Sequence, residues 1–218
     1  MSHYSQGRQD EVLQAIFKKT GTTNKRCVEF GFDSDTLTGG NGANTARLIL
    51  EEGWTGLLMD QGRQNHDINL WRETLTPENL AEVFTRHGVL LESDYVSIDV
   101  DSVDLWLCRA MFQAGYRPRV VSVEYNPNYA LHESVTARPG TTWQYGDQCY
   151  GASLAALYRV GQEFGYHLID AVAGMDVFLV RSDMCEPVPL AEFAKYTQIP
   201  WHAVSAPGRI AAIMMEYP

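Results

Sequence analysis

The stretch "DYVSIDVDSVDLW", residues 94–106, contains a short apolar run that ends among acidic residues. The run at 95–100 has the composition of a strand that is buried on both faces of a sheet. Asp99, Asp101 and Asp104 crowd its far end, where burying a carboxylate is costly unless it is paired or bound. A helical pattern follows at once, which is typical of an α/β fold. The acidic end of the strand is therefore a candidate site.

The same alternation of strand and helix extends along the whole chain. Short runs rich in Val, Ile, Leu and Phe lie at 26–32, 55–60, 95–100, 119–125, 166–173 and 176–182, with a weaker candidate at 67–71. Helical patterns lie between them at 10–19, 44–52, 76–88, 102–115 and 150–165, with Asn44 and Thr76 as predicted caps. This order predicts a doubly wound, mostly parallel sheet. Only residues 173–175 separate the last two strands, so we expect a hairpin and one antiparallel edge strand.

Length, charge and cysteine content narrow the functional classes. A chain of 218 residues is long enough for one large α/β domain, so residues 1–218 are predicted to form a single domain. The net charge of −10 argues against a broad nucleic-acid surface. We see no apolar run of membrane-spanning length and no secretory signal. The four cysteines are widely spaced, which favours neither a zinc site nor a redox pair. We therefore expect a cytoplasmic protein.

Acidic residues occupy four of the predicted strand ends, at 29–33, 60, 99–104 and 124–128. In an open α/β sheet, ligands bind beyond the carboxyl ends of the strands. Because all four strand ends carry acidic residues, together they predict a shared binding crevice.

The first strand end, in "VEFGFDSDTLTGGNGANTARL", has only part of a dinucleotide-binding turn. Gly31 lies at the position of the first glycine of that turn, but the next glycines follow only after a long loop. Glu29, Asp33 and Asp35 would also repel a pyrophosphate. The segment suits a ligand that lacks phosphates and carries positive charge, or else it is an ordinary glycine turn. Asp60, at the second strand end, is either an acceptor for ribose hydroxyls or a solvated surface residue.

These residues carry a resemblance to class I S-adenosylmethionine-dependent methyltransferases, and more narrowly to FkbM-type methyltransferases and related uncharacterised bacterial proteins. The matching segments are "YSQGRQDEVL", "CVEFGFDS", "WTGLLMD", "SDYVSIDVDSVDLW", "RPRVVSVEYNP" and "YGASLAAL". The resemblance implies a Rossmann-like sheet of seven strands. The sequence departs from the family pattern at Arg8 and Gln9 and in its longer first loop, and the last 35 residues match no part of it.

The resemblance also implies roles for individual residues. The methionine and sulfonium end of the cofactor would lie against Glu29, Gly31 and Asp33, and Asp60 would hold the ribose. The N-terminal segment would fold over the cofactor. The remaining residues that we expect near it are Gln6, Asn44, Thr45 and Asp99.

The opening stretch also carries the predicted chemistry. On an extended strand, Asp99 and Asp101 would share a side, with backbones roughly 7 Å apart. Glu124 and Asn126 repeat this spacing at the end of the next strand. Such a cluster could bind the acceptor, act as a general base, or hold a divalent metal such as Mg²⁺ through Asp99, Asp101 and Glu124. Alternatively, Asp101 or Ser102 only caps the following helix.

Residues 127–149 form a predicted lid, since a loop of this length in a compact domain is usually functional or disordered. His132, in the lid, is a possible base or a plain surface histidine. Asn126, Trp143 and Tyr150 are predicted substrate contacts, and Asp147 is a candidate cap for the next helix. Residues 1–22 are expected to form an N-terminal helix. The 184–218 extension is expected either to cover a core edge or to form a subunit contact, as in a homodimer.

Together these features predict S-adenosylmethionine-dependent methyl transfer to a small molecule, and we expect the acceptor atom to be an oxygen. The alternatives are metal-dependent or other non-methyl chemistry at the acidic cluster, and a catalytically silent binding subunit.

Overall fold

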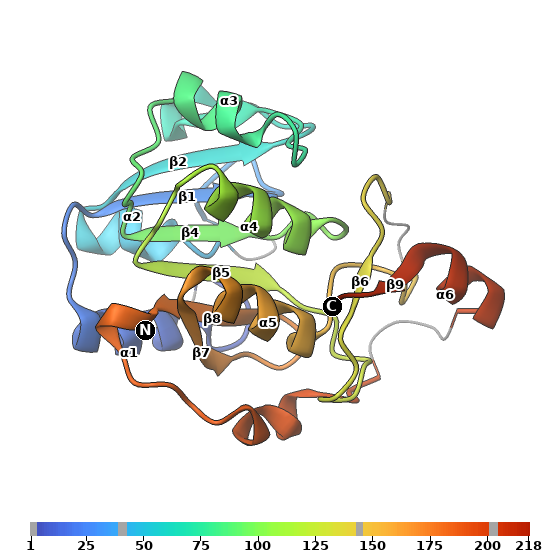
Figure 1. The fold of residues 1–218 in the computed structure, drawn as a ribbon. Coiled ribbons are helices and arrows are strands. Elements are labelled where there is room, and N and C mark those ends of the chain that lie inside the picture. The colour runs from blue at the N-terminus through green and yellow to red at the C-terminus, as the bar shows by residue number, and fades with distance from the viewer. Residues whose placement is uncertain (1–3, 39–42, 143–145, 201–204) are drawn as a thin grey trace. The chain divides into compact units, whose positions relative to one another are not determined.

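The structure is a computed structural model that describes residues 4–38, 43–142, 146–200 and 205–218 (Figure 1). Strands and helices alternate along most of the chain, as the sequence predicts. The strands are β1 (Arg26–Phe30), β2 (Thr55–Asp60), β3 (Leu70–Arg72), β4 (Tyr95–Ile98), β5 (Val120–Glu124), β6 (Val135–Ala137), β7 (Tyr166–Ala171), β8 (Asp176–Arg181) and β9 (Met214–Glu216). The α-helices are α1 (Gln9–Thr20), α2 (Ala46–Glu52), α3 (Leu80–Arg86), α4 (Asp104–Gln113), α5 (Leu154–Phe164) and α6 (Pro207–Ile213). Short 3₁₀ helices are η1 (His66–Ile68), η2 (Ser182–Met184) and η3 (Leu190–Tyr196).

The main sheet has seven strands in the order β3-β2-β1-β4-β5-β8-β7. Strand β1 runs parallel to both β2 and β4, and β2 runs parallel to β3. The hairpin partners β7 and β8 are antiparallel. The predicted doubly wound, mostly parallel sheet with an antiparallel hairpin at one edge is therefore confirmed.

A second sheet pairs β6 with β9 in antiparallel register, joining Val135 to Glu216 and Ala137 to Met214. The sequence did not predict it. Each strand is only three residues long, which is too short for an alternating pattern to stand out.

The chain divides into two compact units, and the first comprises Met1–Asp99 with Ala110–Ser122. Its core includes an aromatic contact between Phe17 of α1 and Trp54, with ring centroids 4.9 Å apart. Helix α2 packs closely on β2 at Gly56, where an added Cβ atom would meet the side chain of Ile49. A larger residue at Gly56 would therefore force the Ile49 side chain to shift.

The second unit comprises Val100–Arg109 and Val123–Pro218. Helix α5 is capped at its start by Ser153, whose side chain accepts a hydrogen bond from the Ala156 N–H, and it is followed by Gly165 in the left-handed conformation. The C-terminal residues pack within this unit, because β9 pairs with β6 and Phe193 of η3 is only 3% exposed. The predicted role of the extension, in covering a core edge or in a subunit contact, stays a prediction.

Three predicted boundaries are wrong. The second helix begins at Ala46 after Thr45, so Asn44 is not its cap. The third helix begins at Leu80 rather than at Pro77, although Thr76 still makes the capping contact expected of it: its hydroxyl accepts the Asn79 N–H, and its own N–H donates to the Asn79 side chain. The weak strand at 67–71 is instead a 3₁₀ helix followed by the short strand β3.

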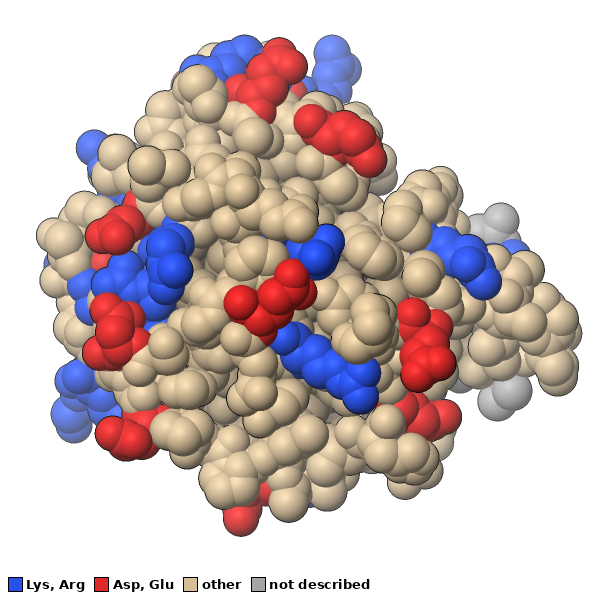
Figure 2. All heavy atoms as spheres, in the orientation of Figure 1, with Lys and Arg blue, Asp and Glu red and all other residues tan. Residues whose placement is uncertain are grey.

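Two surface observations bear on possible partners. Within the described part of the chain, none of the helices combines the length and the apolar character needed to cross a bilayer. Figure 2 shows Lys and Arg side chains interspersed with Asp and Glu. As far as the structure describes this face, it carries no continuous basic patch for nucleic acid to bind.

Candidate active site

The chain order of the sheet reverses beside β1, which pairs with β2 on one side and with β4 on the other. A crevice beyond the carboxyl ends of such strands is the usual ligand site of an open α/β sheet. Gly31 follows β1 at φ 88°, and its N–H donates to the carbonyl of Met59 at 3.0 Å. The Asp99 N–H donates to Phe30 at the end of the same strand. Gly31 and Asp99 therefore lie at the reversal point, as predicted.

Glu29 connects β1 to the start of α2. Its side chain is buried, and it accepts hydrogen bonds from the backbone N–H groups of Asn44 and Thr45, each at 2.9 Å, and from the Thr45 hydroxyl. Burial raises the pKa of Glu29, and the donors from Thr45 and Asn44 oppose that rise. The Asn44 amide also donates to Ser97 on β4. The structure thus brings Glu29, Asn44 and Thr45 together, with Glu29 supplying the contact that a helix cap would make.

Arg63 was not identified from the sequence, although it lies between the first two strand ends. Its guanidinium contacts Asp33 at 2.7 Å and Asp35 at 3.1 Å. Asp60 accepts the N–H groups of Gly62 and Arg63 through one carboxylate oxygen. Asp33 and Asp60 therefore lie where the sequence placed them, but Arg63 offsets part of their charge. The sequence feature that could have identified Arg63 is its position, as a cationic residue three residues after Asp60.

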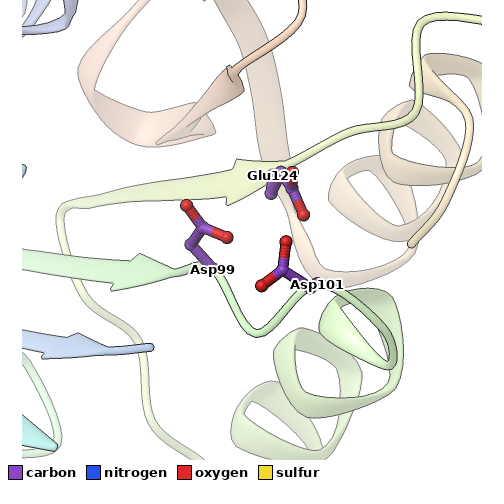
Figure 3. Close-up of side chains that lie close together, drawn as sticks. All are labelled: Asp99, Asp101 and Glu124. Carbon is purple, nitrogen blue, oxygen red and sulfur yellow. The ribbon is translucent and has the colours of Figure 1, made fainter. Parts of the chain in front are cut away.

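The three predicted metal-ligating carboxylates do approach one another. Asp99, Asp101 and Glu124 each offer an oxygen, and these oxygens lie within 4.8 Å of one another (Figure 3). In Figure 3, Asp99 follows a strand, Asp101 precedes a helix, and Glu124 ends the neighbouring strand. The predicted geometry is nevertheless wrong in one respect. Strand β4 ends at Ile98 and Asp101 has φ 59°, so a turn, and not an extended strand, brings the two aspartates together.

Asp104 holds this turn in shape. Its two carboxylate oxygens accept the N–H groups of Val100 at 2.7 Å and Ser102 at 3.0 Å. Asp104 is fully buried, and burial raises its pKa. The Gly151 N–H donates to the carbonyl of Ser102 from the far side. Asp104, the first residue of α4, therefore fixes the turn that precedes the helix, and the predicted capping by Asp101 or Ser102 stays a prediction.

Asn126 organises the loop after β5. Its amide nitrogen donates to the carbonyls of Gln148 and Tyr150, and its oxygen accepts from the backbone and side chain of Asn128. Asn126 and Tyr150 are both buried. Their contacts with substrate stay predictions, and these hydrogen bonds give Asn126 a structural role in any case.

The other predicted site residues are more widely spread. His132 is exposed within the predicted lid, and Gln6 is exposed in the turn before α1. Trp143 lies outside the described residues. The structure therefore adds no contact that would assign a catalytic role to His132.

The predicted lid is held by the C-terminal residues. Arg209 of α6 forms an ion pair with Asp147, and Ser134 exchanges hydrogen bonds with the backbone of Tyr217. Burial opposes ionisation of Asp147, but Arg209 and Ser205 lower its pKa to about 2. The candidate cap role of Asp147 is wrong, since Ser153 caps α5. The lid and the end of the chain therefore form one packed region of the second unit.

Comparisons with known proteins give weak matches to solved structures. One is the MycE methyltransferase from the mycinamycin biosynthetic pathway in complex with Mg and SAH, at 17% identity and a TM-score of 0.45, covering 82% of this chain and 51% of MycE. Another is the glycopeptide N-methyltransferase MtfA complexed with SAH, at 11% identity and a TM-score of 0.40, covering 82% of this chain and 90% of MtfA. This chain spans about half the length of MycE. No family model and no curated protein matches it. Functional inference therefore rests on the site's own residues.

Proposed function

We propose that this protein transfers the methyl group of S-adenosylmethionine to an oxygen of a small molecule. The observation that carries the proposal is the set of carboxylates at the ends of β1, β2 and β4, beside the reversal of strand order. Carboxylates here disfavour a phosphate-bearing ligand and favour a cation, because opposite charges within a few ångströms attract. A sulfonium is such a cation.

The residues at the reversal point fit this cofactor. Gly31 has φ 88° and no side chain, so a ligand can approach the backbone closely at the end of β1. Asp60 ends β2, where an acid can accept hydrogen bonds from ribose hydroxyls. Glu29 acts indirectly, by fixing Asn44 and Thr45 at the start of α2. Gly31, Asp33, Asp60 and Asp99 would therefore contact the cofactor.

The acidic cluster would act on the acceptor. The cofactor would supply a methyl group bonded to a positively charged sulfur, which would leave with the electron pair of the C–S bond as the acceptor oxygen bonds to the methyl carbon. Asp99, Asp101 or Glu124 would hold the acceptor hydroxyl and take its proton as the new bond forms. Alignment of the reacting atoms supplies much of the acceleration in such a step.

Cofactor binding is tested most directly by thermal stability. We expect S-adenosylhomocysteine, at about 100 times its Kd, to stabilise the folded state by about 2.7 kcal/mol. For a chain of this size the midpoint of unfolding should rise by roughly 5–10 °C. Differential scanning fluorimetry measures this shift.

NAD is the matched control for that measurement, since it shares the adenosine but carries a pyrophosphate. An equal shift with NAD would contradict the proposal. No shift with S-adenosylhomocysteine would favour non-methyl chemistry or a silent binding subunit.

The same cluster favours a second candidate, a divalent cation bound by Asp99, Asp101 and Glu124. Carboxylate oxygens are the ligands that Mg²⁺ prefers, usually with several waters completing its shell. Bound there, the ion would lower the pKa of an acceptor hydroxyl.

Mn²⁺ alone is the probe for this candidate. We expect Asp101→Asn to weaken Mn²⁺ binding at least about tenfold, because one charged ligand of the cluster is lost. Water-proton relaxation measures the affinity. Asp67→Asn removes an equal charge from an exposed site, and an equal effect of the two substitutions would exclude a specific site.

A further inference from the structure

The turn before α1 buries two polar side chains of the first unit. Gln9 and Asp10 are only 3% and 2% exposed. One oxygen of Asp10, Oδ2, accepts the N–H groups of Tyr4 at 2.9 Å and Ser5 at 3.4 Å. In return, the Ser5 hydroxyl accepts the N–H of Asp10 at 2.9 Å. These reciprocal hydrogen bonds fix the positions of Gln9 and Asp10.

This turn lies beside the candidate cofactor site. Tyr4 packs against an apolar cluster that includes Phe32, from the loop after β1, and Ala46, from the start of α2. Asp10 is also close enough to Glu29 to raise the pKa of that carboxyl, in addition to the larger effect of burial. The start of α1, the end of β1 and the start of α2 therefore meet in the first unit.

Two buried acceptors at the start of α1 lack donors among the described residues. Among the described residues, none donates a hydrogen bond to Oε1 of Gln9 or to Oδ1 of Asp10. Leaving a buried acceptor unsatisfied costs about 1–3 kcal/mol, and the nearby Glu29 carboxylate adds like-charge repulsion. Buried polar groups without a partner commonly mark the place of a bound ligand, ion or water.

We propose that Gln9 and Asp10, with Glu29 beside them, bind the ammonium group of the donor's amino-acid moiety. An ammonium carries three N–H donors and one positive charge, so it can donate to open acceptors of this kind and offset the charge of nearby carboxylates. Both acceptors are buried, so this binding requires the turn at residues 4–8 to open. This inference rests on the proposed function and assigns one part of the cofactor to named residues.

The test compares S-adenosylhomocysteine with 5′-methylthioadenosine, which lacks the amino-acid moiety. Asp10→Asn is nearly isosteric, and its amide oxygen can keep the hydrogen bonds from Tyr4 and Ser5 while its NH₂ group replaces the open acceptor. We expect this substitution to weaken S-adenosylhomocysteine binding by about 10–100-fold, because a charge-assisted hydrogen bond is lost. Binding of 5′-methylthioadenosine should change by less than about twofold. Isothermal titration calorimetry measures both.

Glu11→Gln is the matched control, since it removes the same charge from the neighbouring exposed position of α1. Gln9→Leu is a second variant that removes the other acceptor, and it should also weaken only S-adenosylhomocysteine. Unfolding midpoints without ligand show that each variant folds. Equal losses for both ligands, or no loss for either, would overturn the inference and assign these atoms to a buried water. If the unaltered protein binds neither ligand, the proposed function itself fails.

Discussion

Replacing Glu124 with Gln should lower methyl transfer by about 10²–10⁴-fold, which is the usual contribution of a positioned general base. The substitution keeps the shape of the side chain and removes the charge that would take the acceptor's proton. Glu124 lies with Asp99 and Asp101 in the cluster (Figure 3). The cofactor contacts that we assign lie on other residues, so the affinity for S-adenosylhomocysteine should stay within about twofold.

The measurement uses the first alcohol or phenol that accepts a labelled methyl group from the unaltered protein in a screen of hydroxylated small molecules. Glu192→Gln, on the exposed face of η3, is the matched control and should leave the rate unchanged. A Glu124→Gln protein that retains full turnover would remove Glu124 from the proposed mechanism. A loss of cofactor binding in parallel with turnover would assign it to the cofactor site instead.

The strands of the first unit could be predicted from the sequence, because they are continuous apolar runs. The segments at 26–30, 55–60 and 95–98 are buried nearly throughout, so burial and sequence pattern coincide. The pairing of β6 with β9 could not be predicted, because the two strands lie far apart in the chain and each is three residues long. Pairings of this kind depend on tertiary packing and leave little local signal.

In the candidate site, too, some features could be predicted from the sequence and others could not. The meeting of Asp99, Asp101 and Glu124 followed from a general property of parallel sheets, namely that strand ends share an edge. The turn that achieves it depends on Asp104, whose hydrogen bonds to Val100 and Ser102 no spacing rule specifies. Arg63 was likewise missed, because its role arises from Asp33 and Asp35 on another segment.

Asp94 supports the opposite end of β4 from the candidate site. Its side chain is 1% exposed and accepts the backbone N–H groups of Thr23, Asn24 and Lys25 at 2.7–2.9 Å. Arg119 donates to the same carboxylate at 3.0 Å. Burial alone would raise the pKa of Asp94, but these donors hold it below the usual range. The loop after α1 is therefore tied to β4 through one carboxylate.

Asp94→Ala should lower the free energy of unfolding by about 3–5 kcal/mol at pH 7, since it leaves a partly buried Arg119 and three N–H groups without their acceptor. This is a large part of the 5–15 kcal/mol that is typical of a folded domain. Urea unfolding followed by circular dichroism measures the difference. Glu82→Gln, at a side chain that is 80% exposed, is the control and should change stability by less than about 1 kcal/mol.

The effect of Asp94 should also depend on pH, in a direction that its pKa fixes. A carboxyl whose pKa is lower in the folded state than in the unfolded state stabilises the fold above the unfolded value, which is about 3.9 for Asp. That stabilisation is lost as the pH falls through the folded pKa, because protonation then weakens the hydrogen bonds in the folded state. The stability gap between the unaltered protein and Asp94→Asn should therefore be constant from pH 7 to 5 and narrow below about pH 4. A gap that widens as the pH falls would mean that Asp94 is held protonated by burial, and that the contacts with Arg119 and the loop do not outweigh the cost of burying its charge.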